Sequence, residues 1–141
     1  MDTTRTTDHD AAWAELREVG VDIVPHLASA FASFRTWQGR VSLVFHSIRY
    51  ARVSEAAFQL GVRGLEDKSY MVRWRACALL AYSLRKDALA KLRPLLQHAD
   101  PRTREDARAA IDAIEKRNHH LYVDRDHSGR ARWVVNEGDA A

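Results

Sequence analysis

The C-terminal part of the sequence carries oxygen donors at a spacing that could bind calcium. Asp124-x-Asp126-x-Ser128-Gly129 has the composition of the opening of a calcium loop, whose early positions supply oxygen ligands. The twelfth position of such a loop is normally a bidentate acid, but here it is Val135. We therefore expect an ordinary Asp-rich turn at this point.

Three histidines in the same part of the chain add nitrogen donors. His119, His120 and His127 match no standard zinc spacing, and a polar end loop explains them equally well. We expect no cofactor and no metal. Whether the three histidines bind a transition metal together with Asp124 and Asp126 stays open at this level.

The sequence offers no distinctive group for catalysis. Cys77 is the only cysteine, and no nearby histidine or helix N-terminus would activate it, so we expect a buried and inert thiol. A single cysteine also excludes an intramolecular disulfide and favours the reduced cytoplasm. No Gly-rich phosphate loop or nucleophile elbow is present. We predict that the protein is not an enzyme.

Aromatic and basic residues form the remaining group with a chemistry of its own. It consists of Arg49, Tyr50, Trp74, Arg75, Tyr82 and Arg85. Trp, Tyr and Arg dominate the energetics of protein interfaces, and rings with guanidinium groups also bind single-stranded nucleic acid. The alternative is that Trp74 packs against a neighbouring helix while Arg73 and Arg104 bond to turn aspartates, because large aromatic residues are mostly buried.

Helices must position these side chains, since apolar residues recur at helical spacing from about residue 10 to residue 118. We expect helices over about 10–19, 22–34, 40–51, 54–66, 67–85, 87–98 and 100–117. Gly39 is predicted to interrupt helical structure before the third helix, and Pro94 is predicted to bend the sixth helix. Ser54 and Asp100-Pro101 are predicted to begin the fourth and the seventh. The short connections predict antiparallel neighbours.

Similar positions recur at an interval of 31 residues in the third, fifth and seventh predicted helices. The sets that it aligns are Val41, Val72 and Thr103; Phe45, Ala76 and Ala107; and Ile48, Leu79 and Ala110. One helix hairpin cannot bury its own apolar stripe, so stacked copies would share a continuous core. The periodicity therefore predicts a solenoid.

Two segments carry a resemblance to a known family: Leu65-Glu66-Asp67…Val72-Arg73-Trp74-Arg75-Ala76 and Leu95-Leu96…Asp100-Pro101…Thr103-Arg104-Glu105-Asp106-Ala107. The chain resembles the HEAT-like repeats over about residues 21–118, especially the short class named after the phycobilisome lyases. The resemblance implies an all-α fold, an α-α superhelix of three helix hairpins in 21–118 used for binding. It also implies that the inner helices line a concave recognition surface, on which the aromatic and basic group would lie.

The two ends of the chain are expected to close this single domain of residues 1–141. A helix over 10–20 that contains Trp13 is predicted to cap the N-terminal repeat. Residues 119–136 change to strict alternation around Asp126-His127-Ser128-Gly129, which predicts a C-terminal β-hairpin. The hairpin would either cap the last repeat or offer an open edge to a partner strand.

Charge suggests the kind of partner. The formal net charge is +3, and residues 31–93 hold twelve basic and four acidic side chains. This excess favours an anionic partner. We predict a non-enzymatic module that grips an acidic protein; the alternatives are nucleic-acid binding and, more weakly, an immunity or accessory role toward a toxin or enzyme. The longest uncharged stretch, Ile23–Phe34, is too short to span a membrane. The sequence does not predict the oligomeric state.

Overall fold

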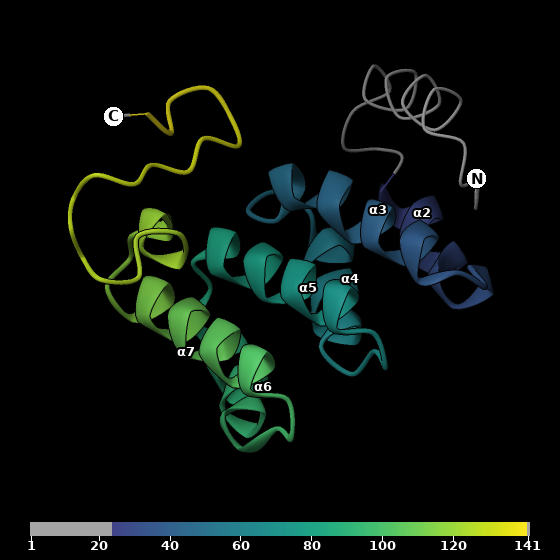
Figure 1. The fold of residues 1–141 in the computed structure, drawn as a ribbon. Helices are drawn as coiled ribbons and strands as arrows, with labels where there is room; N and C mark the ends of the chain where they lie inside the picture. Colours follow the sequence, from purple (N-terminus) through teal and green to yellow (C-terminus); the bar gives the residue numbers. More distant parts are fainter. Residues whose placement is uncertain (1–23, 141) are drawn as a thin grey trace.

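The computed structural model describes residues 24–140, in which helices follow one another along the chain (Figure 1). The predicted helix over 10–20 lies outside these residues. The α-helices are α2 (Val24–Ala30), α3 (Trp37–Ser47), α4 (Glu55–Gly64), α5 (Tyr70–Ser83), α6 (Leu89–Leu92) and α7 (Pro101–Glu115). The 3-10 helices are η2 (Phe31–Ser33), η3 (Ile48–Tyr50), η4 (Lys86–Ala88), η5 (Arg93–Gln97) and η6 (His119–Tyr122).

Side-chain caps begin the helices where the sequence carries them. The Ser54 hydroxyl accepts the amide of Ala57 at 3.1 Å, and the Asp100 carboxylate accepts the amide of Arg102 at 2.9 Å. Both predicted starts are confirmed. The predicted break at Gly39 is wrong, because the hydroxyl of Thr36 accepts the Gly39 amide and α3 begins before it.

The α-helices form two layers around a shared core. Helices α3, α5 and α7 lie side by side, with α5 in the middle, while α4 packs behind α5 and α6 behind α7 (Figure 1). Helices α4 and α5 approach closely at Gly64, where an added Cβ would stand 2.8 Å from the Cβ of Ala76. The largest fully buried apolar side chains include Leu43, Leu60, Leu79, Leu80, Leu92 and Ile114. No helix within residues 24–140 is both long and apolar enough to cross a bilayer.

The buried positions repeat, but the first copy is displaced from its predicted alignment. Phe45 is 44% exposed, whereas the predicted equivalents Ala76 and Ala107 are fully buried. Leu43 is fully buried and takes the place predicted for Phe45. The interval from Leu43 to Ala76 is therefore two residues longer than that from Ala76 to Ala107. The predicted alignment of the first copy is therefore wrong at Phe45, and Val41 is only half-buried where Val72 and Thr103 are fully buried. Ile48 is buried, as are its predicted equivalents Leu79 and Ala110.

A row of arginines and aspartates joins neighbouring helix pairs at one end of the stack. Arg40 donates to both carboxylate oxygens of Asp67, at 2.7 and 3.2 Å. Arg73 donates to Asp100 at 3.3 Å and to the hydroxyl of Thr103 at 3.0 Å. Each aspartate stands 27 residues after its arginine. We call Arg40, Asp67, Arg73 and Asp100 the arginine–aspartate row.

The same type of arginine closes the loop that precedes each of these helices. Arg40 donates to the carbonyl of Phe34, Arg73 to that of Asp67, and Arg104 to that of His98, each six residues earlier. The expected bond from Arg73 to a turn aspartate is thus present, while Arg104 binds only backbone carbonyls. The three loops are therefore closed at the same sequence distance by equivalent side chains.

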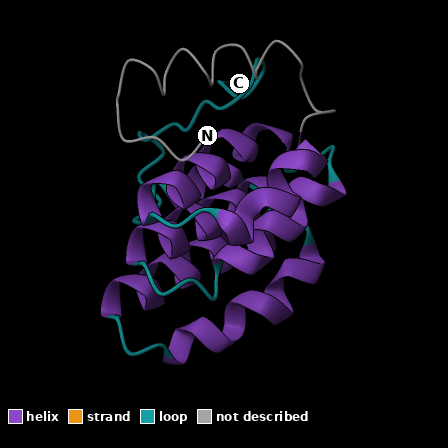
Figure 2. Ribbon diagram, turned by 90° about the vertical axis from the view of Figure 1, so that its right-hand side faces the viewer, coloured by secondary structure: helices purple, strands orange, loops and turns teal. Residues whose placement is uncertain are grey.

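The predicted C-terminal β-hairpin is wrong, since residues 24–140 contain no β-strand (Figure 2). The side chain of Asn118 accepts the amide of His120 and begins the 3-10 helix η6 instead. The Asp124 carboxylate then accepts the amides of Ser128 and Gly129, at 3.0 and 2.8 Å. These local bonds engage the amides of His120, Ser128 and Gly129, which are therefore not available to a hairpin ladder.

We refer to residues 119–140 as the C-terminal segment, which runs back across α5 toward the end of α3 (Figure 1). The hydroxyl of Tyr122 donates to the carbonyl of Trp74 at 3.0 Å. The amide group of Asn136 donates to the carbonyl of Arg49 at 2.8 Å. The segment therefore covers much of the α5 face that the sequence pattern assigns to recognition.

Candidate functional site

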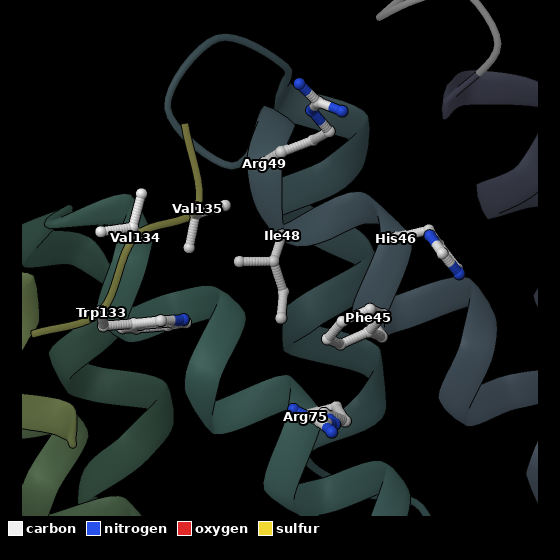
Figure 3. A pocket seen from close by; sticks show the side chains of 8 residues that line it. All are labelled: Phe45, His46, Ile48, Arg49, Arg75, Trp133, Val134 and Val135. Atoms are coloured by element: carbon white, nitrogen blue, oxygen red, sulfur yellow. The ribbon is translucent and has the colours of Figure 1, made fainter. Parts of the chain in front are cut away.

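A pocket of about 210 Å³ opens where the C-terminal segment meets α3, η3 and α5 (Figure 3). Its lining contains basic, aromatic and aliphatic side chains but no aspartate or glutamate. The lining residues are Phe45, His46, Ile48, Arg49, Arg75, Trp133, Val134 and Val135. A pocket with this lining favours an anion attached to an apolar group.

The guanidinium of Arg75 is the central charge of this pocket. It lies 3.8 Å from the ring centroid of Trp74 and 4.6 Å from that of Phe45. Its Nε atom is buried without an acceptor, and none of its donors makes a hydrogen bond or ion pair within residues 24–140. Burial lowers the pKa of Arg75 from its ordinary value. An unsatisfied buried donor costs about 1–3 kcal/mol, which the two ring contacts offset in part.

The structure brings two predicted site residues into the pocket and places two beside it. Arg49 and Arg75 both line the pocket. Arg49 is exposed, and its guanidinium lies 5.7 Å from the ring centroid of Tyr50. Tyr50 and Trp74 are half-buried and support the two arginines from outside the lining.

Tyr82 and Arg85 do not belong to this surface. Tyr82 is only 1% exposed, because the C-terminal segment covers it, and its hydroxyl donates to Asp139 at 2.8 Å. Arg85 forms ion pairs with Glu55 and Asp87, away from the pocket. The structure therefore does not place Tyr82 and Arg85 on one exposed face, as the sequence pattern predicted.

Sequence reasoning misses the apolar walls of the pocket. The repeat assigns Phe45 and Ile48 to the core, although the Phe45 ring faces the pocket (Figure 3). The alternation assigns Trp133 and Val135 to the apolar face of a hairpin. No sequence signal links this part of the chain to η3, because the hydrogen bond that connects them comes from a single side chain, that of Asn136.

The candidate metal ligands are not gathered at one point. Within the part of the chain that the structure describes, no group of three or more His, Cys, Asp or Glu side chains could hold a metal ion. His127 pairs with Asp112, and Asp124 is occupied by the turn described above. His119 and His120 instead hold the backbone of Trp133, at 2.9 Å each.

His119 makes the attachment of the C-terminal segment sensitive to pH. Arg52 donates to its Nδ1 atom at 3.1 Å, so the ring proton lies on Nε2, which donates to the carbonyl of Trp133. Protonation of Nδ1 would place its N–H group against the N–H group of Arg52, so that two donors would face each other. Burial is the main cause that lowers the pKa of His119, and the charges of His120 and Arg52 lower it further.

The free energy of unfolding should therefore fall as the pH drops below about 6.5, the pKa of histidine in an unfolded chain. Above that pH the residue is neutral in both states, and below it the unfolded state binds a proton that the folded state resists. Urea titrations at about pH 7.5 and about pH 5.5 measure the difference. In His119→Gln the decrease over this interval should be smaller; an unchanged decrease would assign it to other groups.

Comparison with known families, curated proteins and solved structures finds no match for this chain.

Proposed function

We propose that the protein is a non-enzymatic binding module of HEAT-like repeat type that recognises an acidic surface on a partner protein. The observation that carries the proposal is the guanidinium of Arg75, which stands in a pocket without any acidic lining residue and without an acceptor of its own in residues 24–140. A preorganised cation of this kind gains most from an incoming carboxylate.

The pairing of the other arginines supports a confined site. Within residues 24–140 the arginines that form ion pairs are Arg40, Arg52, Arg73, Arg85, Arg102, Arg108 and Arg125. Four of the twelve basic side chains in residues 31–93, those of Arg40, Arg52, Arg73 and Arg85, are paired in this way. Binding along a phosphate backbone uses many available cations in a row, and these four arginines are not available for it.

The repeated contacts support the solenoid part of the proposal. Arg40 and Arg73 reach equivalent aspartates, and the buried positions Leu43, Ala76 and Ala107 recur on neighbouring helices. A cytoplasmic location is part of the same proposal, because Cys77, the only cysteine, is a buried free thiol.

Affinity purification with quantitative mass spectrometry tests the proposal. We expect wild-type protein to retain a partner with an acidic surface and the double variant Arg49→Glu/Arg75→Glu to lose it. Arg93→Glu reverses an exposed charge that does not line the pocket and should retain the partner. Circular dichroism shows whether each variant is folded, and Arg49→Glu alone alters only an exposed residue.

Two results would contradict the proposal. One is equal capture by the wild-type protein and by the folded double variant. The other is capture that disappears on nuclease treatment and weakens steeply with salt, which is the behaviour of a nucleic-acid complex.

A further inference from the structure

We infer that the pocket binds the carboxylate side chain of an aspartate or glutamate in an extended peptide segment of the partner, with an apolar residue beside it. This inference rests on the proposed function and specifies its ligand. It combines three features of the site: the unpaired guanidinium of Arg75, the apolar walls and the free backbone groups of Val134.

The contacts of Arg75 select a carboxylate. Trp74 and Phe45 interact with the π system of the guanidinium. Its Nε–H is buried, and its two Nη groups make no hydrogen bond within residues 24–140, which leaves them for a ligand. A carboxylate matches these donors with two parallel hydrogen bonds, and the guanidinium remains charged at all physiological pH values. Arg49 lines the same pocket and adds a second positive charge without an ion-pair partner in residues 24–140.

The walls select an apolar neighbour for that carboxylate. Phe45 and Val134 are among the exposed large hydrophobic residues, at 44% and 58% exposure, and both line the pocket. A volume of about 210 Å³ is smaller than that of pockets for drug-sized ligands, about 300–1,000 Å³. The site therefore suits one or two side chains rather than a nucleotide or a cofactor.

The C-terminal segment offers a fixed backbone edge at the mouth of the pocket. The amide and carbonyl of Trp133 are bonded to His120 and His119, and the amide of Val135 is bonded to Asp139. Between them, the amide and carbonyl of Val134 have no hydrogen-bond partner in residues 24–140. A peptide that lies alongside Val134 can pair with these two groups, as a strand adds to a sheet edge.

The experiment uses two peptide libraries and the full chain. Both libraries consist of N-acetylated, C-amidated heptapeptides with aliphatic or aromatic residues around a central residue, which is glutamate in one and glutamine in the other. Blocked ends leave the side chain as the only carboxylate. Each library is titrated into ¹⁵N-labelled protein, and the amide signals of Phe45, Ile48, Arg75 and Val134 are followed.

We expect the glutamate library to shift these signals and to bind with an affinity at least about tenfold higher than that of the glutamine library. Arg75→Gln should abolish the difference between the libraries, Arg75→Lys should restore only part of it, and Arg93→Gln should leave it unchanged. Lysine keeps the positive charge but not the planar fork of donors, so its intermediate value separates the contribution of charge from that of two-point hydrogen bonding.

Equal binding of the two libraries, or a preference for glutamate that survives Arg75→Gln, would overturn the inference. Its failure can be told apart from failure of the proposed function. If affinity purification yields an acidic partner that Arg49→Glu/Arg75→Glu loses while the glutamate library does not bind, the module function stands and the extended-peptide mode is wrong. If neither experiment shows binding at the pocket, both are wrong.

Discussion

Replacing Arg73 with alanine should lower the free energy of unfolding by about 2–4 kcal/mol, because it removes the donor of two buried acceptors at about 1–3 kcal/mol each. The Arg73 side chain is only 7% exposed and donates to Asp100, to Thr103 and to the Asp67 carbonyl. Its removal leaves the Thr103 hydroxyl and the Asp67 carbonyl without this donor, while Asp100 keeps the hydrogen bonds from Arg102. It also removes the ion pair that joins α5 to the start of α7.

Thermal and urea unfolding measure this effect, and the midpoint temperature should fall by about 10 °C. Arg108→Ala is the matched control, because Arg108 also forms an ion pair on a helix, but with Glu105 on an exposed surface. A surface pair of this kind contributes about 0.3–0.5 kcal/mol. Similar losses in the two variants would mean that the arginine–aspartate row does not stabilise the stack.

The second large effect is expected at the C-terminal segment when Asp139 is replaced by alanine. One oxygen of Asp139 accepts the Tyr82 hydroxyl and the amides of Val135 and Asn136, at 2.8, 3.0 and 2.8 Å. Hydrogen bonds to a charged group contribute about 1.5–3 kcal/mol each. Their loss should detach residues 133–139 locally while the helices remain folded.

Hydrogen exchange shows the detachment directly. The amides of Val135 and Asn136 should exchange at least about tenfold faster in Asp139→Ala. The tryptophan fluorescence of the chain, to which Trp133 is one of four contributors, should shift to longer wavelength as the Trp133 ring becomes hydrated. Glu137→Ala removes an exposed acid from the same segment and should change neither readout. Unchanged exchange in Asp139→Ala would show that other contacts hold the segment.

Two helix starts were predictable because their causes are local. Ser54 and Asp100 begin helices through bonds to amides two or three residues away, and such spacings are visible in a sequence. The helix predicted over 87–98 with a bend at Pro94 is instead a short α-helix, Leu89–Leu92, between two 3-10 helices, the second of which contains the proline.

The hairpin prediction failed because alternation and β-propensity do not reveal competing side-chain bonds. Val123, Trp133 and Val135 fit a strand pattern, but the backbone of Trp133 is bonded to two histidine rings and not to another strand. The partners are 13 and 14 residues apart and come from a 3-10 helix. Propensity scales describe average surroundings and do not contain such contacts.

Only part of the candidate site could be predicted for a similar reason. Arg75 and Trp74 are neighbours in the sequence, so their pairing follows from one helix. The Tyr82 ring contacts Trp133, and its hydroxyl is bonded to Asp139, 57 residues later. Arg85 is neutralised by Glu55, 30 residues earlier. Helical periodicity gives the direction of a side chain but not what covers it.

The ion pairs of the arginine–aspartate row are equally spaced along the chain. Arg40 and Arg73 each find their acid 27 residues further on, so the two aspartates are separated by the same interval as the two arginines. If the stretch 67–99 were duplicated in tandem, each copied arginine would again meet an aspartate at the same distance. Gene duplication could therefore lengthen this protein by copies of this stretch, and each copy would bring the residues for its own ion pair to the next.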